Sequence, residues 1–574
     1  MLVEADRQVT RAKVPPIVLA AFFAGLVPFA LHTWAALHGS LAQDDFLITY
    51  RAGTSGLFDP GYLFQDYQGH LAPGCFLLTW LLTAWAPLNF AVLTIPLLLM
   101  QAATLVFFWM LLVRCFGRRW ALLVPFTVFA ASNLVLVPTL WWAYGIQILP
   151  VLLGMAAALY SHVRYLQDGG RWWGGTVAWT VFGLSFYEKA VFIPIMVAGI
   201  TVLLREPLRK HLKLWAALGA VLVGYVVLLL SVTTSQVAHG EGDVSAGTVA
   251  DLIGRMLGDT LLPGLLGGPW SGPGPGATWN PSPIFVSAGL LVLAVVVVVI
   301  SRKSWRAWAL LGGVTAADIG LVTATRFTDV GPALGNDPRY VAELAMIAAL
   351  CGAFAFLGPD GGSARERPLA LGITGLLVLS SVVAFQNLAP ALRFSQSSQY
   401  LGNVRAAVAA DPELVLYDTF VPRDVMHEWF ADNSRASHVV GLVPGIKFDQ
   451  AALRIHQLDD TGTPRRITGV EPDARSRPGP VKDCGYLVNE DPVRIPLDKP
   501  LMGRFLMKLD YFTSDGGEGT VEAGGKSQKV WFPGGLHSVF VPLDGLFDSV
   551  TVQLVGKGAP ICAATLDIGK PVTQ

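Results

Sequence analysis

Charged residues are scarce in this chain of 574 residues. They make up 14% of it, against about 25% in an average soluble domain. Hydrophobic residues reach 53% and the mean hydropathy is +0.51, which disfavours a water-soluble globular protein and indicates a membrane protein with several spans. The formal net charge is +0 at pH 7, so no excess of positive charge favours a nucleic-acid partner.

The motifs of soluble nucleotide and metal chemistry are also missing. The sequence has no Walker loop, no Gly-x-Gly-x-x-Gly run before a helix and no zinc-type spacing of cysteine and histidine. It has no internal repeat with a solenoid period. The sequence therefore gives no support for a soluble nucleotide-dependent enzyme, and no motif predicts a cofactor.

Cysteine is rare, with five in the chain. Cys75, Cys115 and Cys351 lie in or beside apolar segments, where we expect them to pack as small hydrophobic side chains. Cys484 and Cys562 lie in the polar last third of the chain. On an oxidising side of a membrane these two can form a disulfide, and two buried free thiols are the alternative.

Long apolar runs are what the sequence has in abundance. A spanning helix needs roughly 20 mostly apolar residues. About eleven segments fit by the window rule, namely 14–38, 90–113, 120–140, 145–163, 173–187, 190–204, 214–233, 284–301, 307–325, 341–357 and 369–389. A cleaved signal peptide is the alternative for the first segment, but its length and the Pro15–Pro16 pair favour an uncleaved helix.

The distribution of basic residues indicates whether the short apolar segment 73–86 crosses the membrane or lies at its surface. If this segment lies at the membrane surface as a juxtamembrane or re-entrant helix, about 17 basic residues fall in inner segments and about 5 in outer ones. This asymmetry is the one that the positive-inside rule expects. We therefore predict a cytoplasmic N-terminus, outer loops at 39–89 and 234–283, and an extracytoplasmic C-terminus in a bacterial plasma membrane.

Two domains are expected. Residues 1–391 would form the transmembrane domain, and the apolar runs stop at about residue 392. Residues 392–574 alternate as strands do, for example in "RFLMKLDYF" and "SVTVQLV", with turn clusters such as "TSDGGEG" between several of them. This pattern predicts an extracytoplasmic β-sandwich after an α/β lead-in around 400–445.

Two adjacent acids, Asp44 and Asp45, follow the first apolar segment in the stretch "LAQDDFLITYRAG". A carboxylate within hydrogen-bond reach of a hydroxyl can take its proton while the oxygen attacks a carbon centre. A second acid beside it raises the pKa of one member if both share a dry site. The pair could alternatively hold a divalent metal. In the simplest alternative, Asp44 caps a short helix and Asp45 lies in its first turn.

The longer string "DDFLITYRAGTSGLFDPGYLFQDYQGHLAPG", residues 44–74, resembles the outer loop of GT-C superfamily membrane glycosyltransferases, including actinobacterial arabinofuranosyltransferases. In those proteins an acidic pair precedes a "YRYA"-like run and a later "GYT-P" segment. Here "YRA" and "GHLAPG" stand in their places, and His-Leu replaces Tyr-Thr, which leaves the subfamily and the sugar open. The resemblance implies a polyprenyl-phosphate sugar donor, inversion by direct displacement with a single base, and a carbohydrate-binding-like C-terminal domain in some relatives.

The candidate site residues follow from this loop and from outer charges elsewhere. Asp44 is the predicted base and Asp45 its partner. Candidates for binding the substrate are Tyr50, Arg51, Asp66, His70 and Glu188. Candidates for binding the donor phosphate are Arg339, Arg326, Tyr340 and Lys189, because arginine presents a planar fork to phosphate oxygens.

Each cation also has a structural alternative. Arg339 could instead pair with Asp337 or with Glu343, which is four residues on at a favourable helical spacing. Glu188 and Lys189 could form a local ion pair at the turn of a tight hairpin.

Two further polar or aromatic features lie in the apolar part. Asp318, inside a predicted span, could accept a hydrogen bond within the bundle. The aromatic run "WWAYGIQ" at 141–147 is better interpreted as an interfacial belt than as a substrate contact.

The sequence thus predicts an inverting glycosyltransferase that moves a sugar, arabinose or mannose, from a polyprenyl-phosphate donor to an extracytoplasmic envelope glycan or glycolipid. A flippase for lipid-linked glycans is one alternative, and it would show charges or broken helices near the membrane midplane. A non-catalytic scaffold whose C-terminal domain binds glycan is the other.

Overall fold

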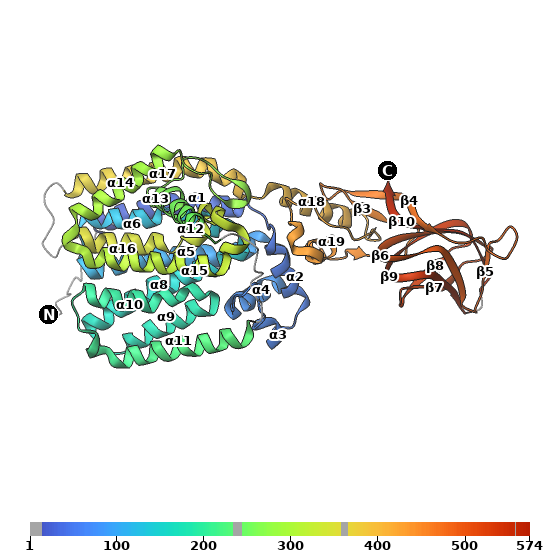
Figure 1. The fold of residues 1–574 in the computed structure, drawn as a ribbon, viewed down its shortest axis with the longest axis horizontal. Helices are drawn as coiled ribbons and strands as arrows, with labels where there is room; N and C mark the ends of the chain where they lie inside the picture. Colours follow the sequence, from blue (N-terminus) through green and yellow to red (C-terminus); the bar gives the residue numbers. More distant parts are fainter. Residues whose placement is uncertain (1–13, 234–243, 358–365, 557) are drawn as a thin grey trace, which may run out of the picture. The chain divides into compact units, whose positions relative to one another are not determined.

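The computed structural model describes residues 14–233, 244–357, 366–556 and 558–574 (Figure 1). The chain divides into two compact units. Unit 1 comprises the described residues of 1–41 and 51–394, and unit 2 comprises 42–50 together with the described residues of 395–574. The segment 42–50, which carries the acidic pair, is therefore part of the C-terminal unit.

Unit 1 is a bundle of apolar helices. Among its described residues, seven helical stretches are long and apolar enough to cross a membrane. They correspond to α1 (Pro16–Leu37), α5 (Phe90–Phe116), the run Trp120–Leu140 with α6 (Leu123–Ala130) and α7 (Leu136–Leu140), α8 (Trp142–Asp168), α11 (Leu212–Val232), α15 (Trp305–Val330) and α17 (Glu366–Leu392). The chain is a multi-pass membrane protein.

Shorter helices complete this bundle. They are α3 (Pro60–Leu63), α4 (Pro73–Trp85), α9 (Trp172–Phe186), α10 (Phe192–Leu203), α12 (Ala246–Gly254), α13 (Leu262–Leu265), α14 (Ile284–Ile300) and α16 (Leu344–Phe356). A π-helical stretch, Arg255–Leu261, joins α12 to α13. The helix α2 (Asp44–Thr54) begins in unit 2 and ends in unit 1.

All eleven predicted segments contain helix, but the number of spans stays a prediction. The helices α9, α10 and α16 have 15, 12 and 13 residues. At 1.5 Å per residue they are roughly 18–23 Å long, shorter than the hydrocarbon core of about 30 Å. The 13 residues of α4 fall short in the same way, as a juxtamembrane helix would.

The helix α8 is the centre of unit 1. Every residue from Trp142 to Val163 is buried, so this helix is covered on all sides. Glycine permits the close packing, because a β-carbon at Gly154 would lie 2.9 Å from the Trp179 carbonyl oxygen on α9. At its start, a β-carbon at Gly145 would lie 2.0 Å from the Pro138 carbonyl oxygen. The backbone of α8 therefore lies in close contact with its neighbours at both places.

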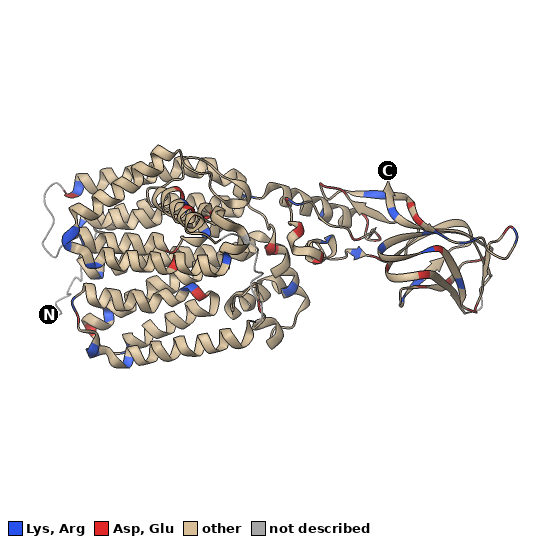
Figure 2. Cartoon of the chain, in the orientation of Figure 1, with Lys and Arg blue, Asp and Glu red and all other residues tan. Residues whose placement is uncertain are grey.

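Charged residues are sparse along the helices of unit 1, and many Lys and Arg gather at one end of the bundle (Figure 2). Two ion pairs lie among the basic residues that the sequence assigns to the inner side. Arg114 pairs with Asp168 at 2.6 Å, and Arg119 pairs with Glu366 at 3.2 Å. The gathering fits the charge asymmetry of the sequence, and the orientation in the membrane stays a prediction.

Unit 2 joins a small α/β part to an extended sheet. Its elements after residue 394 are α18 (Ser395–Ala410), β1 (Val415–Leu416), α19 (Ala436–Val439), β2 (Lys447–Phe448), β3 (His456–Leu458), β4 (Pro464–Arg475), β5 (Tyr486–Val488), β6 (Val493–Thr513), β7 (Gly517–Ala523), β8 (Lys526–Phe532), β9 (Gly535–Val555) and β10 (Ile561–Thr573). The strand β1 runs parallel to β2 and β3, so the α/β lead-in predicted around 400–445 is present.

The strands form one hydrogen-bonded path in the order β2-β1-β3-β4-β10-β6-β9-β7-β8, with β5 on β10. The longest pair is β6 with β9, two strands of 21 residues whose pairing shifts between Pro496 and Leu501. Alternate residues of β4 to β10, such as Met507 and Val541, fill one buried cluster. The chain thus ends in a β-sheet unit, and its division into two facing sheets stays a prediction.

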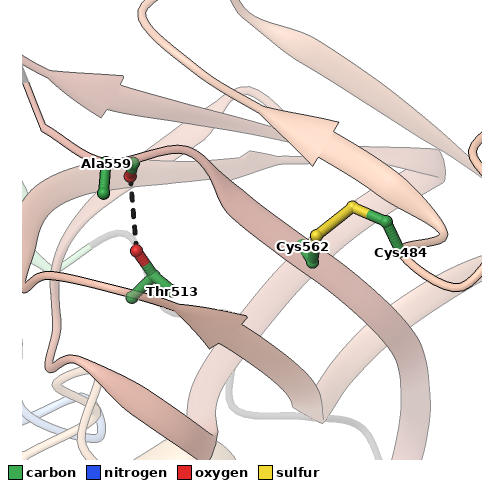
Figure 3. Close-up of a disulfide and its surroundings, with 4 residues drawn as sticks. All are labelled: Cys484, Thr513, Ala559 and Cys562. Atoms are coloured by element: carbon green, nitrogen blue, oxygen red, sulfur yellow. Dashed lines mark hydrogen bonds between the residues drawn. A yellow bond between two sulfur atoms is a disulfide. The ribbon is translucent and has the colours of Figure 1, made fainter.

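A disulfide joins Cys484 to Cys562 at the β10 side of this sheet (Figure 3). Nearby, the Thr513 hydroxyl donates a hydrogen bond to the Ala559 carbonyl oxygen at 3.3 Å. The remaining cysteines are free: Cys75 and Cys351 are buried and Cys115 is partly buried. This burial agrees with the packing role expected for apolar-segment cysteines.

Candidate functional site

The acidic pair forms the first turn of α2. Asp45 is 0% exposed, and its Oδ2 accepts a hydrogen bond from the Ala42 backbone amide at 3.0 Å. Asp44 is partly exposed. Carboxylates are favourable at this end of a helix, where backbone amides lack partners. Asp45 thus lies in the first turn, as the structural alternative expects, and supports the helix start. Asp44 is partly exposed, and its role as a base stays a prediction.

In unit 1, three polar side chains from distant parts of the chain meet at His70. The His70 Nδ1 lies 2.7 Å from Glu188 Oε1, and its Nε2 lies 2.8 Å from a terminal nitrogen of Arg326. That nitrogen also donates to the Gln68 carbonyl oxygen at 2.9 Å. We call His70, Glu188 and Arg326 the His70 cluster. It unites two predicted substrate-binding residues with one predicted phosphate-binding residue.

Hydrogen-bond chemistry fixes the proton on His70. A guanidinium can only donate, so Nε2 of His70 must accept from Arg326 and cannot carry a proton. The ring proton is then on Nδ1, which donates to the Glu188 carboxylate. The second oxygen of that carboxylate, Oε2, is buried and accepts no hydrogen bond from the described part of the chain. In the His70 cluster, the His70 ring therefore orients Arg326, and Glu188 orients the His70 ring.

Lys189 makes different contacts from those of its neighbour Glu188. Its side chain is 1% exposed, and its ammonium donates to Glu343 Oε1 at 2.6 Å and to the Tyr340 carbonyl oxygen at 2.8 Å. It also forms an ion pair with Asp318 at 2.8 Å. The alternative of a local ion pair between Glu188 and Lys189 is wrong, because each side chain has remote partners. With three contacts for three N–H groups, Lys189 is not retained as a phosphate ligand.

Arg339 lies in an aromatic setting beside one carboxylate. Its guanidinium pairs with Asp337 at 2.6 Å, whereas the alternative pairing with Glu343 is wrong because Glu343 binds Lys189. The guanidinium carbon lies 4.9 Å from the Trp141 ring centre and 5.7 Å from that of Tyr340. Cations are stabilised over aromatic faces at such distances. Asp337 thus neutralises Arg339, which makes Arg339 a weaker phosphate candidate than Arg326.

The aromatic run that opens α8 is not an interfacial belt. Trp142 is 0% exposed, Tyr144 is 7% exposed and Trp141 is 8% exposed, all within the protein. The Tyr144 hydroxyl donates to the Arg339 carbonyl oxygen. The belt interpretation was wrong because the sequence cannot tell a lipid-facing helix end from one that neighbouring helices cover.

Three further predicted residues make contacts within their own units. Arg51 donates to Gln65 Oε1 at 2.9 Å, and the Asp66 carboxylate accepts from the Gly69 amide at 2.8 Å, so both stabilise the loop of unit 1. In unit 2, the Tyr50 ring lies 4.6 Å from the ring of His438. Sequence reasoning did not single out Gln43, which precedes the acidic pair and hydrogen-bonds to Arg423 and His427, because its polar side chain belongs to no motif.

A second charged group lies in unit 2, where parallel strands end. Asp418 follows β1 and is 2% exposed, and its carboxylate accepts from both the Ser437 amide and the Ser437 hydroxyl, at 2.8 and 2.9 Å. Arg504 on β6 pairs with Asp418 and with Asp449. Burial raises the pKa of Asp449 above its ordinary value. This group ties the loop around Ser437 to the sheet.

The described residues hold no cluster suited to binding a metal ion. Within them, no three His, Cys, Asp or Glu side chains gather as a metal site would require. The divalent metal considered for the acidic pair stays an untested alternative.

Comparisons with known proteins give structural neighbours only. No protein-family model and no curated protein matches the chain. Two crystal structures of ArnT from Cupriavidus metallidurans, in the apo state and bound to undecaprenyl phosphate, are 12% and 13% identical, with TM-scores of 0.44 and 0.42. Both alignments cover 78% of this chain and 94% of the other.

A cryo-EM structure of the arabinofuranosyltransferase AftD from Mycobacteria is 12% identical over 98% of this chain, with a TM-score of 0.32, and this chain spans 59% of AftD. All these TM-scores are below 0.5, so we base no functional argument on the likeness.

Proposed function

We propose that the protein is a membrane glycosyltransferase that transfers a sugar from a polyprenyl-phosphate donor to an extracytoplasmic glycan or glycolipid. The observation that carries the proposal is the acidic pair in the first turn of α2, with Asp45 buried and Asp44 partly exposed. An acceptor hydroxyl is a weak nucleophile and needs one base. Asp44 is that base, and Asp45 holds the turn that orients it.

The anomeric carbon is inverted in a single displacement. The acceptor oxygen forms a bond to this carbon while the bond to the lipid phosphate breaks. The acceptor proton passes to Asp44, and the phosphate leaves with the bonding electron pair. Only one base is required, in contrast to the two carboxylates of a glycosidase.

The leaving phosphate needs a cation, and Arg326 fits this role best. Only one of its guanidinium nitrogens is engaged by described residues, with Gln68 and His70. The other donors of its planar fork suit two phosphate oxygens. Arg339, already paired with Asp337, and Tyr340 remain secondary candidates for the same phosphate.

The orientation and the setting of the enzyme follow from the positive-inside count. We propose that the outer loops and unit 2 face the extracytoplasmic side of a bacterial plasma membrane, with a cytoplasmic N-terminus. A polyprenyl carrier dissolves in the bilayer, so its reactive carbon lies at the membrane surface beside the loop that carries the acids.

Sugar transfer in membranes is the test of the proposal. Membranes containing the full chain are supplied with radiolabelled polyprenyl-phosphate arabinose or mannose, and label in the glycan and glycolipid fractions is counted. Transfer that requires Asp44 supports the enzyme. Donor that crosses a vesicle bilayer without transfer would contradict it and support the flippase alternative.

Changing Arg326 to alanine is expected to raise the KM for the donor by about 10- to 100-fold, because a charge-assisted hydrogen bond contributes roughly 1.5–3 kcal/mol. Arg326→Lys keeps the charge but loses the planar fork, so its donor KM should lie in between. Initial rates against donor concentration measure the effect. Arg302→Ala is the matched control, an exposed arginine on the predicted inner side. An unchanged donor KM in Arg326→Ala would remove Arg326 from the phosphate site.

The flippase alternative has one observation in its favour, the buried charges of Lys189, Asp318 and Glu343. A transport path would need charges that bind and release a cargo ion or headgroup. Here the ammonium has three partners among these charges and the Tyr340 carbonyl oxygen. We therefore assign Lys189, Asp318 and Glu343 a structural role, stabilising the helix bundle, and keep the glycosyltransferase as the proposed function.

A glycan-binding role for unit 2 is supported by the outward face of β7, β8 and β9. Glu518 pairs with Trp531 on one side and with Val555 on the other. Trp531 is 59% exposed and lines a shallow cleft of about 230 Å³ with Glu518 and Lys529. An exposed indole offers an apolar face for a sugar ring, and the charged neighbours can hydrogen-bond its hydroxyls.

Trp531→Ala is accordingly expected to weaken binding of arabinan and mannan oligosaccharides by up to about tenfold, since an aromatic contact contributes about 0.5–1.5 kcal/mol and about 1.4 kcal/mol corresponds to a tenfold change in affinity. Binding is measured by titration of the full protein in detergent. Phe512→Ala is the matched control, because Phe512 is an aromatic residue with 52% exposure that lies outside this cleft. Equal losses in both variants, or no loss in Trp531→Ala, would contradict the assignment.

A further inference from the structure

The acidic segment is anchored at Gln43, the residue before Asp44. The Gln43 amide donates to the Val425 carbonyl oxygen at 2.9 Å. Its side-chain Nε2 donates to the Arg423 carbonyl oxygen at 3.2 Å, and its Oε1 accepts from the His427 amide at 2.8 Å. Three hydrogen bonds thus join one residue to a single stretch, 423–427, of the C-terminal unit. We call Gln43 and residues 423–427 together the Gln43 clamp.

The backbone of Gln43 is unusual for its residue type. Its φ is +52°, in the left-handed region that residues with a β-carbon avoid. Such a conformation persists when the surrounding contacts determine it, and it is enriched at functional sites. The turn it makes leads directly into the first turn of α2. The clamp therefore sets where Asp44 and Asp45 begin their helix.

A second contact holds the same segment at Tyr50, seven residues after Gln43. The Tyr50 ring packs edge-on against His438 at 4.6 Å between centres. A β-carbon at Gly441 would lie 3.4 Å from the Tyr50 ring, so the backbone passes close beneath it. The segment 43–50 is thus held at both ends by residues of 423–441.

The loop that holds Tyr50 is itself fastened to the sheet. The Asp418 carboxylate accepts two hydrogen bonds from Ser437, which adjoins His438, and pairs with Arg504 on β6. Burial of Asp418 at 2% exposure makes these contacts strong, because buried charged hydrogen bonds face little competition from water. A continuous set of contacts therefore runs from the sheet to the acidic segment within unit 2.

We propose that the C-terminal unit positions the base Asp44 and that Gln43 is the positioning residue through which it does so. The inference rests on the proposed function. Gln43 touches no reacting atom in this scheme and acts through the helix start. The glycan binding proposed for Trp531 is a separate hypothesis and does not enter this inference.

Gln43→Gly separates the side-chain clamp from the backbone turn. Glycine adopts a positive φ without strain, so this variant loses the two side-chain hydrogen bonds and keeps the turn accessible. We expect kcat to fall about tenfold or more, with donor KM within about threefold, because small displacements of a catalytic group cost rate rather than ground-state binding. Gln43→Ala also loses the two side-chain hydrogen bonds, and its β-carbon keeps the strain of the positive φ. Its kcat should therefore fall at least as far as that of Gln43→Gly.

Gln528→Ala is the matched control. Gln528 is another glutamine of unit 2 whose side-chain amide donates to a backbone carbonyl, that of Pro542. Its kcat and donor KM should equal those of the unaltered protein. The unfolding temperature of each variant is measured, and Gln43→Gly should match Gln528→Ala.

Hydrogen exchange of the amides of residues 44–50 gives a readout that does not depend on transfer. It should speed up at least tenfold in Gln43→Gly and stay unchanged in Gln528→Ala. If the unaltered protein transfers no sugar, the proposed function fails while the exchange result still decides the clamp. Unchanged exchange in Gln43→Gly overturns the clamp, and faster exchange with an unaltered kcat overturns the positioning role.

Discussion

Asp44→Asn is expected to lower kcat for sugar transfer by about 10²- to 10⁴-fold, the usual contribution of a general base. The amide is close in size to the carboxylate, so the donor should still bind, with its KM within about threefold. Steady-state rates with a radiolabelled polyprenyl-phosphate sugar measure both constants. A fall in kcat alone would mean that Asp44 acts in the transition state and not in binding.

Asp59→Asn is the matched control for this change. Asp59 is an exposed acid of the same predicted outer loop, and its carboxylate caps α3 by accepting from the Gly61 amide at 2.9 Å. Asparagine caps a helix about as well as aspartate, so this variant should transfer sugar normally. Equal rates for Asp44→Asn and Asp59→Asn would remove Asp44 from the chemistry.

The comparison with Asp45→Asn distinguishes the base from its support. Asp45 is 0% exposed and accepts a hydrogen bond from Ala42, a bond that an asparagine oxygen can also accept. We therefore expect Asp45→Asn to keep more activity than Asp44→Asn. The opposite order, in two variants with the same unfolding temperature, would exchange the roles of the two acids.

Local patterns explain how much of the fold could be predicted. Runs such as 90–113 became helices because apolar residues in lipid must satisfy their backbone groups within the helix. The alternation in "RFLMKLDYF" became part of β6, with Met507 and Leu509 buried and Lys508 partly exposed. Periodicity of two or of 3.6 residues is a property of neighbouring residues, so it can be read without knowing the partners.

The partners of charged residues could not be predicted in this way. His70 and Glu188 are 118 residues apart, and Lys189 and Glu343 are 154 apart. Glu188 and Lys189 are adjacent in sequence, which suggested that they pair with each other. They lie on the 3₁₀ turn Glu188–Val191, where adjacent side chains do not face each other, so Glu188 contacts His70 and Lys189 contacts Glu343. Gln43 escaped notice for the same reason, because its partners begin 380 residues later, at Arg423.

Lys189→Met is expected to destabilise unit 1 by about 3–5 kcal/mol, the usual cost of removing one partner from a buried ion pair. Asp318 and Glu343 are both 0% exposed, so the change would leave two carboxylates without their cation. The measurement is the yield of monodisperse protein in detergent together with its unfolding temperature. Lys303→Met, at an exposed lysine, is the control and should behave as the unaltered protein.

The triple variant Lys189→Met, Asp318→Asn and Glu343→Gln separates charge from packing. It removes all three charges at once, and buried ion pairs replaced by neutral residues often retain stability. Most of the lost yield and unfolding temperature should therefore return, although the hydrogen bond from Lys189 to the Tyr340 carbonyl oxygen is still missing. Sugar transfer should return with the fold, because none of these three residues contacts the substrate in the proposed reaction. A triple variant that is stable but inactive would contradict the structural role of the group and place its charges in the chemistry or in a transport path.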